Sequence, residues 1–270
     1  MDGKTGQLIY SRKETRKREI ASLTKMMNLL CVLKLLEEYR IDPKNTYLEV
    51  SKLASSMRGT SANLRSGDVL SVWDLLHGLM LPSGNDAAWA LAESFGKFIY
   101  LRSEEYQVKC RDSKASACKN PLKYFLRFMN KTAQDLGMIH TNYANPHGLV
   151  NPFNVSTAGD QATLSHHLLK WEMAREIVNT QVYSCEIEMP HNKVRKSTWE
   201  NTNKLLGKEG WGGVKTGITT AAGYCLSSYY QKGDEEYIVI LLCSSSKEIR
   251  WVEAPQLVQF ARKIREELQL

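Results

Sequence analysis

The sequence contains no apolar run as long as the roughly 20 residues that a membrane-spanning helix needs, so it predicts no membrane span. Its first residues, MDGKTG, also lack the apolar stretch of a signal segment. The six cysteines include no C-x-x-C pair and no spacing typical of zinc ligands, and no internal repeat is visible. We therefore expect no metal, no cofactor and no repeat array. A chain of 270 residues is long enough to bury a full core.

Charge of one sign is not concentrated in this chain. The 36 basic and 29 acidic residues give a net charge of +7, and the basic residues are scattered apart from the run Arg12–Arg18. We interpret this run as a solvated turn and expect no nucleic-acid partner, with an anionic polymer as the alternative. Cys31 and Cys243 read as core residues. Cys110 and Cys118 lie in a charged loop and could pair in an oxidising compartment.

Three short motifs follow one another along the chain: Ser22-Leu23-Thr24-Lys25, Ser83-Gly84-Asn85 and Lys215-Thr216-Gly217. Together they supply a hydroxyl nucleophile, an amine that can deprotonate it, a second hydroxyl with an amide, and a cationic strand end. This set is typical of serine acyl transfer that uses Lys rather than His as the base. Each motif alone is weakly specific, so the surrounding sequence has to identify the working copies.

The sequence around the first motif favours a reactive serine. Residues 23–39 form a helix pattern without Gly or Pro, and their apolar side chains cover much of the circumference, as in a buried helix. Ser22 is expected at the start of this helix, where the helix dipole favours negative charge, and Lys25 lies on the same face. Burial would lower the pKa of Lys25 and make it a base. The alternative is an N-cap Ser22 with a solvated Lys25.

Further copies of the motifs occur in less suitable contexts. Two of them lie in a charged or turn-rich loop, one follows an apolar strand and is expected to cap the next helix, and one is at the N-terminus. These copies are Ser116-Ala117-Cys118-Lys119, Ser61-Ala62-Asn63, Ser244-Ser245-Ser246-Lys247 and Lys4-Thr5-Gly6. We interpret all four as structural.

The second and third motifs are each open to two interpretations. The Ser83–Asn85 motif joins two predicted helices, 72–81 and 86–101, so it is either a plain turn with a capping residue or a turn that points two polar groups into a cleft. The Lys215–Gly217 motif lies in a glycine-rich strand region. Small residues there allow a peptide backbone to approach closely, whereas the alternative is a hairpin with a solvated lysine.

With these motifs the chain resembles the serine D-alanyl-D-alanine carboxypeptidases, the low-molecular-weight penicillin-binding proteins of peptidase family S11. The similarity covers roughly residues 6 to 262. Its segments are ASLTKMM (21–27), SSMRGTSANLRSGDVLSVWDLLHGLMLPSGNDAAWALAE (55–93), NPHGL (145–149), WENTNKLL (199–206) and GVKTGITTAAGY (213–224).

The resemblance implies a mixed α/β (α+β) fold of the penicillin-binding-protein and serine β-lactamase type. Residues 1–270 would form a single catalytic domain, with a mostly helical subdomain at roughly 42–180 inserted between sheet-forming ends and no second β-domain. The sequence patterns agree with it. They predict strands at Gly6–Ser11, 181–189, 211–218, 222–230 and 236–244, helices at 22–40, 72–101, 122–137, 157–178 and Glu248–Leu268, and an inserted loop at Ser103–Pro121.

The resemblance also implies a role for each motif residue. Ser22 would attack the carbonyl before a terminal D-alanine, Lys25 would act as base, and Ser83 would pass the proton to the leaving amine. Substrate-binding groups would be Asn85, Lys215, Thr216, Gly217 and Ile218, with the backbone N–H groups of Ser22 and Ile218 as oxyanion hole. Arg195 and Arg250 would lie near the substrate carboxylate, or alternatively form structural ion pairs. His147 would lie in a turn and form hydrogen bonds with the backbone. The pair His166–His167 would not bind a metal, because neighbouring side chains of a helix point apart.

The implied substrate is a peptide that ends in D-Ala-D-Ala, and β-lactams would be covalent inhibitors. Kinship implies an extracytoplasmic or secreted enzyme, although no signal segment is visible and the compartment stays unknown. Alternatives are a DD-endopeptidase, a β-lactamase or glutaminase, and a catalytically silent peptide-binding relative. No glutamate between His147 and Val214 stands in the E-x-x-L-N setting of a class A β-lactamase, so we expect slow release of β-lactams.

Overall fold

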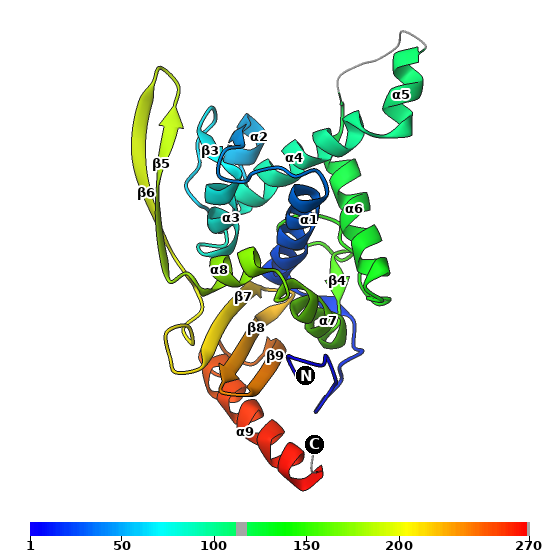
Figure 1. The fold of residues 1–270 in the computed structure, drawn as a ribbon, viewed down its shortest axis with the longest axis vertical. Coiled ribbons are helices and arrows are strands. Elements are labelled where there is room, and N and C mark those ends of the chain that lie inside the picture. The colour runs from blue at the N-terminus through cyan, green and yellow to red at the C-terminus, as the bar shows by residue number, and fades with distance from the viewer. Residues whose placement is uncertain (112–117, 269–270) are drawn as a thin grey trace.

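The computed structural model describes residues 1–111 and 118–268, whose arrangement is drawn in Figure 1. Helices fill the upper part of this view and surround α1 (Thr24–Glu38), while the lower part holds a three-stranded sheet above α9 (Arg250–Leu268). The short 3-10 turn η1 (Ala21–Leu23) leads into α1 and packs against the sheet. The start of α1 therefore lies where the helical part and the sheet meet.

The sheet consists of β7 (Trp211–Thr219), β8 (Gly223–Lys232) and β9 (Glu235–Ser244), all antiparallel and in that spatial order. Alternate side chains point to opposite faces of a strand. On β8, Leu226 and Tyr230 accordingly pack toward α9, whereas Cys225 and Tyr229 join the main core around α1. Both faces are covered, and β7 is an edge strand whose only ladder partner among the described strands is β8.

Helix α1 is the centre of the main core. Every residue from Thr24 to Leu33 is buried, including the polar Thr24, Lys25 and Asn28. Its apolar side chains pack against α4, α6 and the helices nearest the sheet. The predicted burial of this helix is confirmed, which removes the solvated-lysine alternative for Lys25.

Most of the remaining elements come after α1 and before β7 in the sequence. The helices are α2 (Lys52–Ser55), α3 (Val72–Met80), α4 (Asn85–Leu101), α5 (Glu104–Arg111), α6 (Pro121–Asp135), α7 (Ala158–Leu168) and α8 (Glu172–Asn179). The strands are β1 (Arg18–Glu19), which pairs with β4 (Val155–Ser156), and a four-stranded sheet of β2 (Tyr47–Glu49), β3 (Val69–Ser71), β5 (Val182–Met189) and β6 (Lys193–Glu200). The hairpin β5–β6 projects from the body (Figure 1).

The predicted strand at Gly6–Ser11 is wrong. A strand needs a neighbour that accepts and donates its backbone hydrogen bonds. Here a groove of about 770 Å³ lies between residues 8–11 and β9, and no strand among the described residues pairs with this segment. The N-terminus contributes only the bridge between Asp2 and Tyr237, with Gly3 N–H donating to the Glu236 carbonyl at 2.7 Å. The sheet is therefore built almost entirely from the C-terminal part of the chain.

Other differences from the predicted elements are smaller. The predicted helix at 157–178 is divided into α7 and α8 at residues 169–171, and strand β6 was not predicted. Half of the predicted loop at Ser103–Pro121 is helix α5. Residues 112–117, with Ser116, lie outside the described residues, as does the side chain of Cys110. The thiol of Cys118 is free, and its pairing with Cys110 stays a prediction for the oxidised protein. Cys31 is buried, as predicted, but the core prediction for Cys243 is wrong, because Cys243 lies near the end of β9 and is exposed.

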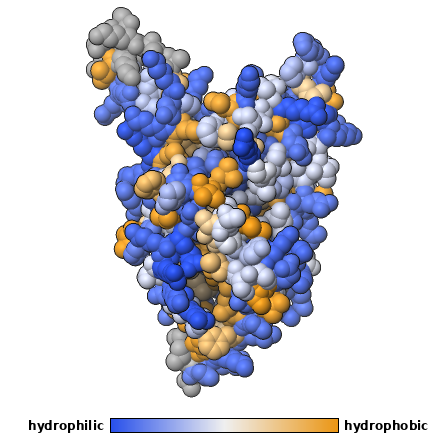
Figure 2. All heavy atoms as spheres, turned by 180° about the vertical axis from the view of Figure 1, so that it is seen from behind, coloured by the Kyte–Doolittle hydropathy of each residue, from blue (hydrophilic) through white to orange (hydrophobic). Residues whose placement is uncertain are grey.

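Hydrophilic side chains cover most of the face drawn in Figure 2, and apolar atoms gather in a vertical strip down its middle. None of the helices that can be described is both long and apolar enough to span a bilayer.

Candidate active site

Ser22 lies in the turn η1, directly before the N-terminal end of α1. This turn is strained, because Ala21 has a φ of +48°, a region that costs a non-glycine residue about 1–3 kcal/mol. The Thr24 hydroxyl donates to the Ala21 carbonyl at 2.9 Å, and Asn154 donates to the Thr24 hydroxyl at 2.8 Å. Gly148 packs so closely that a Cβ there would lie 1.9 Å from the Ala21 carbonyl oxygen. Ser22 is thus held at the positive end of a buried helix.

Lys25 connects the nucleophile to two other segments. Its Nζ lies 3.0 Å from Ser22 Oγ, 2.7 Å from Asn85 Oδ1 and 2.7 Å from the His147 carbonyl oxygen. The side chain is fully buried. Burial, followed by the positive charge of Lys215, lowers the pKa of Lys25 well below its usual value of 10.5. A neutral amine this close to Ser22 Oγ can accept the hydroxyl proton.

Ser83 combines a strained backbone with an unpartnered hydroxyl. Its φ is +64°, and its buried hydroxyl has no hydrogen-bond partner among the described residues. A leaving group could therefore use this hydroxyl without displacing another contact. Thr60 stabilises this strained conformation through two hydrogen bonds. Its hydroxyl donates to the Ser83 carbonyl at 2.6 Å, and its carbonyl accepts from the Asn85 N–H at 2.8 Å.

Thr60→Val should slow acylation by a β-lactam by up to about tenfold, because one hydrogen bond that holds Ser83 is worth about 0.5–1.5 kcal/mol. Thr60→Ser, which keeps the hydroxyl, is the matched control and should acylate at close to the wild-type rate. Stopped-flow measurement of the acylation rate tests this. Equal rates for Thr60→Val and wild type would show that Thr60 does not position Ser83.

The second S-x-N copy has a structural role. Ser61 Oγ donates to the buried carboxylate of Asp86, and the backbone N–H groups of Ala62 and Leu64 donate to the same carboxylate at 2.9 and 3.1 Å. Asn85, by contrast, accepts from Lys25 and donates to the Arg58 carbonyl at 2.6 Å. The loop at 60–64 therefore fixes the start of α4, and Asn85 of the Ser83–Asn85 motif is the member that reaches the nucleophile cluster.

The Lys215–Gly217 motif runs alongside the Ser22 turn on β7. Gly217 faces this turn so closely that a Cβ would lie 3.0 Å from the Ile20 carbonyl oxygen. Lys215 and Thr216 are buried, with 2% and 8% of their surface exposed, whereas Ile218 is 48% exposed. The motif strand thus carries a buried lysine, a buried hydroxyl and an accessible end, and Gly217 packs against the turn that holds Ser22.

Arg250, at the start of α9, adds a second buried cation to this end of the sheet. Its guanidinium donates to the carbonyls of Cys225 at 2.7 Å and Lys247 at 3.3 Å, and no described carboxylate lies within ion-pair distance. Burial, and then the charge of Arg250, lowers the pKa of Lys215 to about 7. Lys215 and Arg250 therefore form a cationic region that favours an anionic ligand.

Arg195 does not join this region. It lies on β6, and its guanidinium contacts the buried carboxylate of Asp68 and donates to the Asn63 carbonyl at 2.9 Å. The ion pair ties the hairpin to the loop before β3. These contacts favour the structural alternative for Arg195 and leave Arg250 as the arginine near the motif strand.

The acylation rate should depend on pH through Lys215. Its positive charge is present below its pKa of about 7 and is lost as the pH rises through that value. We expect kcat/KM for a substrate with a free carboxylate to fall above about pH 7, because kcat/KM reports groups of the free enzyme. Lys215→Arg keeps the charge and should move this fall to higher pH. A pH–rate profile unchanged in Lys215→Arg would exclude Lys215 as its cause.

Other residues singled out by the sequence have structural contacts. Ser246 Oγ accepts from the Ile249 N–H and so closes the turn at 247–249 that precedes α9, one turn short of the predicted helix cap. The motif at Lys4–Gly6 is a turn around Asp2. His147 Nδ1 accepts from a backbone N–H, as predicted, and burial lowers the pKa of His147 to about 3. No cluster that could hold a metal ion occurs among residues 1–111 and 118–268.

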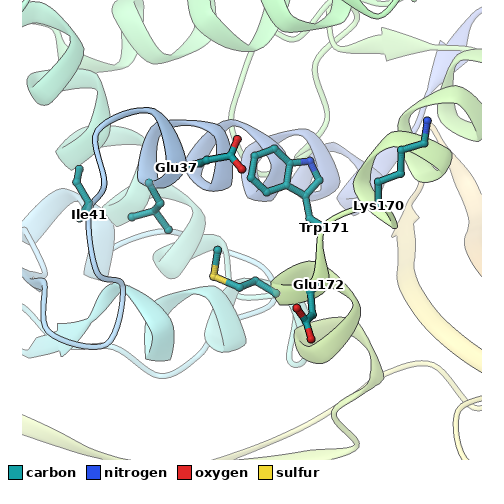
Figure 3. Close-up of a pocket in the computed structure, with 7 residues that line it drawn as sticks. Glu37, Ile41, Lys170, Trp171 and Glu172 are labelled. Carbon is teal, nitrogen blue, oxygen red and sulfur yellow. The ribbon is translucent and has the colours of Figure 1, made fainter.

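A separate pocket lies at the other end of α1. Figure 3 shows Glu37 and Ile41 on one side of it and Trp171 and Glu172 from the α7–α8 junction on the other. Its volume is about 480 Å³. Leu36, which lines this pocket, lies fourteen positions after Ser22, which corresponds to roughly 20 Å along a helix axis. The pocket is therefore separate from the site around Ser22 and Lys25.

Known proteins have sequences and folds similar to those of this chain. The family model of the D-alanyl-D-alanine carboxypeptidases, peptidase S11, matches residues 1–101 and 115–245. The chain belongs to this family. The resemblance seen in the sequence is confirmed.

Three relatives show how far the similarity extends. D-alanyl-D-alanine carboxypeptidase DacF of Bacillus subtilis is 31% identical over 95% of this chain, but the chain spans only 59% of that relative. The D-alanyl-D-alanine carboxypeptidase of Streptomyces strain K15 is 31% identical over 96% of this chain and 84% of its own length. A D-alanyl-D-alanine endopeptidase of Pseudomonas aeruginosa is 30% identical over 83% of this chain and 63% of its own length.

A solved structure confirms the predicted fold class. The Streptomyces K15 DD-transpeptidase superimposes with a TM-score of 0.85 at 29% identity, covering 97% of this chain and 95% of that one. The mixed α/β architecture with antiparallel sheets is therefore that of the DD-peptidases. The division into a single domain with an inserted helical subdomain at roughly 42–180 stays an interpretation.

Proposed function

We propose that this protein is a serine-type D-Ala-D-Ala carboxypeptidase that removes the terminal D-alanine of peptidoglycan-like peptides through an acyl-enzyme on Ser22. The observation that carries this proposal is the contact of 3.0 Å between Ser22 Oγ and the fully buried Lys25, beside a cationic strand end. Membership of the S11 family supports the same reaction class. The substrate and the penicillin-type inhibitors are part of the proposal.

Acylation uses the buried amine as a base. The neutral Nζ of Lys25 takes the hydroxyl proton of Ser22 while Oγ forms a bond to the carbonyl carbon before the terminal D-alanine. The backbone N–H groups of Ser22 and Ile218 stabilise the oxyanion, and one such donor is typically worth about 3 kcal/mol. When the C–N bond breaks, the hydroxyl of Ser83 passes the proton to the leaving amine of D-alanine.

Deacylation returns the enzyme to its starting state. Water attacks the ester, one proton returns through the same lysine, and Ser22 Oγ leaves as the hydroxyl. Asn85 holds the substrate amide during both steps, and its own position is fixed by Lys25 and by the Arg58 carbonyl. In a class A β-lactamase a glutamate in an E-x-x-L-N motif activates the deacylating water. No glutamate between His147 and Val214 lies in such a motif here, so we expect penicillin esters to be hydrolysed slowly.

The terminal carboxylate is recognised by the cationic region. Arg250 has no carboxylate partner within the described residues and lies close enough to affect the charge of Lys215. A substrate carboxylate would compensate both cations and accept a hydrogen bond from the hydroxyl of Thr216. This arrangement favours a chain end over a chain interior, and hence a carboxypeptidase over an endopeptidase.

Amidating the terminal carboxylate of an acyl-D-Ala-D-Ala peptide should lower kcat/KM by roughly one to two orders of magnitude. The amide loses a charge-assisted hydrogen bond, typically worth about 1.5–3 kcal/mol. Measurement of D-alanine release from the acid, and of D-alanine amide release from the amide, tests this. Arg250→Ala should reduce the discrimination, while Arg195→Ala should leave it intact.

Equal turnover of acid and amide would refute the carboxypeptidase assignment. It would favour the endopeptidase alternative, in which the edge of β7 binds the interior of a chain. No turnover of either peptide, with no acylation by penicillin, would instead leave a catalytically silent peptide-binding relative.

A further inference from the structure

The segment WENTNKLL, which the proposed mechanism does not use, reaches the candidate site through one side chain. Thr202 follows β6, and its Oγ1 lies 2.7 Å from Oγ1 of Thr216 on β7. Thr216 is 8% exposed. The hydroxyl that is proposed to bind the substrate carboxylate therefore already has a hydroxyl neighbour.

Thr202 is held in place from its N-terminal side by Asn201. The side-chain amide of Asn201 donates to the carbonyls of Val178 and Thr180, both at 3.1 Å, and its backbone N–H donates to the Gln181 carbonyl at 2.8 Å. These three bonds join the start of the loop to the end of α8 and the residues after it. The backbone before Thr202 cannot shift without breaking them.

Asn203 holds the other side. Its buried side chain donates to Ser228 Oγ at 3.3 Å and accepts from the Leu205 N–H at 2.9 Å, and its own N–H donates to Asn201 Oδ1 at 3.0 Å. Thr202 thus stands between two anchored asparagines. A rigid scaffold around a single hydroxyl is what a positioning group requires, because its hydrogen bond then keeps one direction.

The hydroxyl pair can exist in two arrangements. When Thr216 donates to Thr202, its single hydrogen is occupied and cannot point at a carboxylate. When Thr202 donates to Thr216, the hydrogen of Thr216 is free for the carboxylate, and the two bonds in series strengthen each other. An anionic ligand beside Lys215 and Arg250 selects the second arrangement.

We propose that Thr202 is a positioning residue that orients the Thr216 hydroxyl toward the free carboxylate of the substrate, and so helps the enzyme to select chain ends. This inference rests on the proposed carboxypeptidase function. It names a specificity determinant that short motif patterns do not contain.

The test compares Thr202→Val, which has a similar shape but no hydroxyl, with Thr202→Ser. The readout is the ratio of kcat/KM for an acyl-D-Ala-D-Ala acid to that for its amide. Thr202→Val should reduce this ratio by about 3- to 10-fold with amide turnover unchanged, the effect of one lost hydrogen bond, and Thr202→Ser should keep the ratio. Thr198→Val is the matched control, because it removes a hydroxyl that pairs with Ser184 at 2.8 Å on the exposed hairpin.

A double-mutant comparison separates positioning from a structural role. In a Thr216→Val background, Thr202→Val should change the ratio no further, because the hydroxyl it orients is gone. Equal losses for acid and amide, an unchanged ratio, or additive losses would each overturn the proposal. If Thr202→Val does not fold, Thr202→Ala gives the same comparison.

The proposal can be tested even if the peptide reaction fails. Penicillin G and its methyl ester differ only in the carboxylate, and their acylation rates give the same ratio without D-alanine release. Wild type that is acylated by penicillin but releases no D-alanine would refute the proposed function alone. In that case an unchanged acid-to-ester ratio in Thr202→Val would refute the role of Thr202, and a reduced ratio would support it.

Discussion

Ser22→Ala is expected to lower kcat for D-alanine release by roughly 10⁶-fold, the scale typical of removing the nucleophile of a serine hydrolase. The hydroxyl of Ser22 is the one that lies within hydrogen-bond distance of the buried Lys25 Nζ. No other serine in the described residues shares that contact, so no neighbour can substitute for it. The measurement is single-turnover hydrolysis of an acyl-D-Ala-D-Ala peptide, with a melting temperature to show that the variant is folded.

Ser244→Ala is the matched control for this variant. Ser244 begins the S-x-x-K copy at the end of β9, and its hydroxyl donates to Glu253 at 3.2 Å, on α9. Full activity is expected for Ser244→Ala. Retention of more than a small fraction of activity in Ser22→Ala would mean that another residue is the nucleophile.

Lys25→Ala should slow acylation of Ser22 by about 10²–10⁴-fold, the usual contribution of a positioned general base. Burial and the charge of Lys215 lower the pKa of Lys25, so its amine can act as a base more readily than that of an ordinary lysine. The variant also loses the hydrogen bonds to Asn85 and to the His147 carbonyl. We therefore expect a lower melting temperature together with the slower reaction.

The lysines of the two other S-x-x-K copies provide controls. Lys119→Ala and Lys247→Ala should acylate at nearly the wild-type rate. The contact of Lys247 with Arg250 uses its backbone carbonyl, which alanine retains. A Lys25→Ala variant that acylates as fast as wild type would contradict the role of Lys25 as base.

The local part of the site could be predicted from the sequence. Ser22 and Lys25 are three residues apart at the start of a predicted buried helix, so their contact follows from helical spacing and from an apolar pattern that leaves no solvated face. The structure differs only in placing Ser22 in the turn η1 that leads into α1. The resemblance to a family then selected Ser83, Asn85 and Lys215. The structure brings Asn85 into contact with Lys25, and the charge of Lys215 lies close enough to lower the pKa of Lys25. Asn85 is 60 residues from Lys25, and no local pattern connects the two.

Features that depend on non-local partners could not be predicted in this way. The segment at Gly6–Ser11 has the short apolar run Leu8–Tyr10 of a strand, but no described strand pairs with it across the groove beside β9. Arg195 was a candidate for binding the substrate carboxylate because a guanidinium suits that ligand. Its guanidinium instead pairs with Asp68, which lies 127 residues away in the sequence. The contact between Thr202 and Thr216 has no sequence signature at all, because it joins a loop to a strand.

The most direct test of a serine acyl-transfer enzyme is to locate the covalent adduct formed with penicillin G. We predict one penicilloyl group per molecule, and after proteolysis and mass spectrometry it should lie on the peptide that contains Ser22. The adduct should persist during the experiment because deacylation is slow. An adduct on Ser116, Ser244 or any other residue, or no adduct on folded protein, would contradict the account.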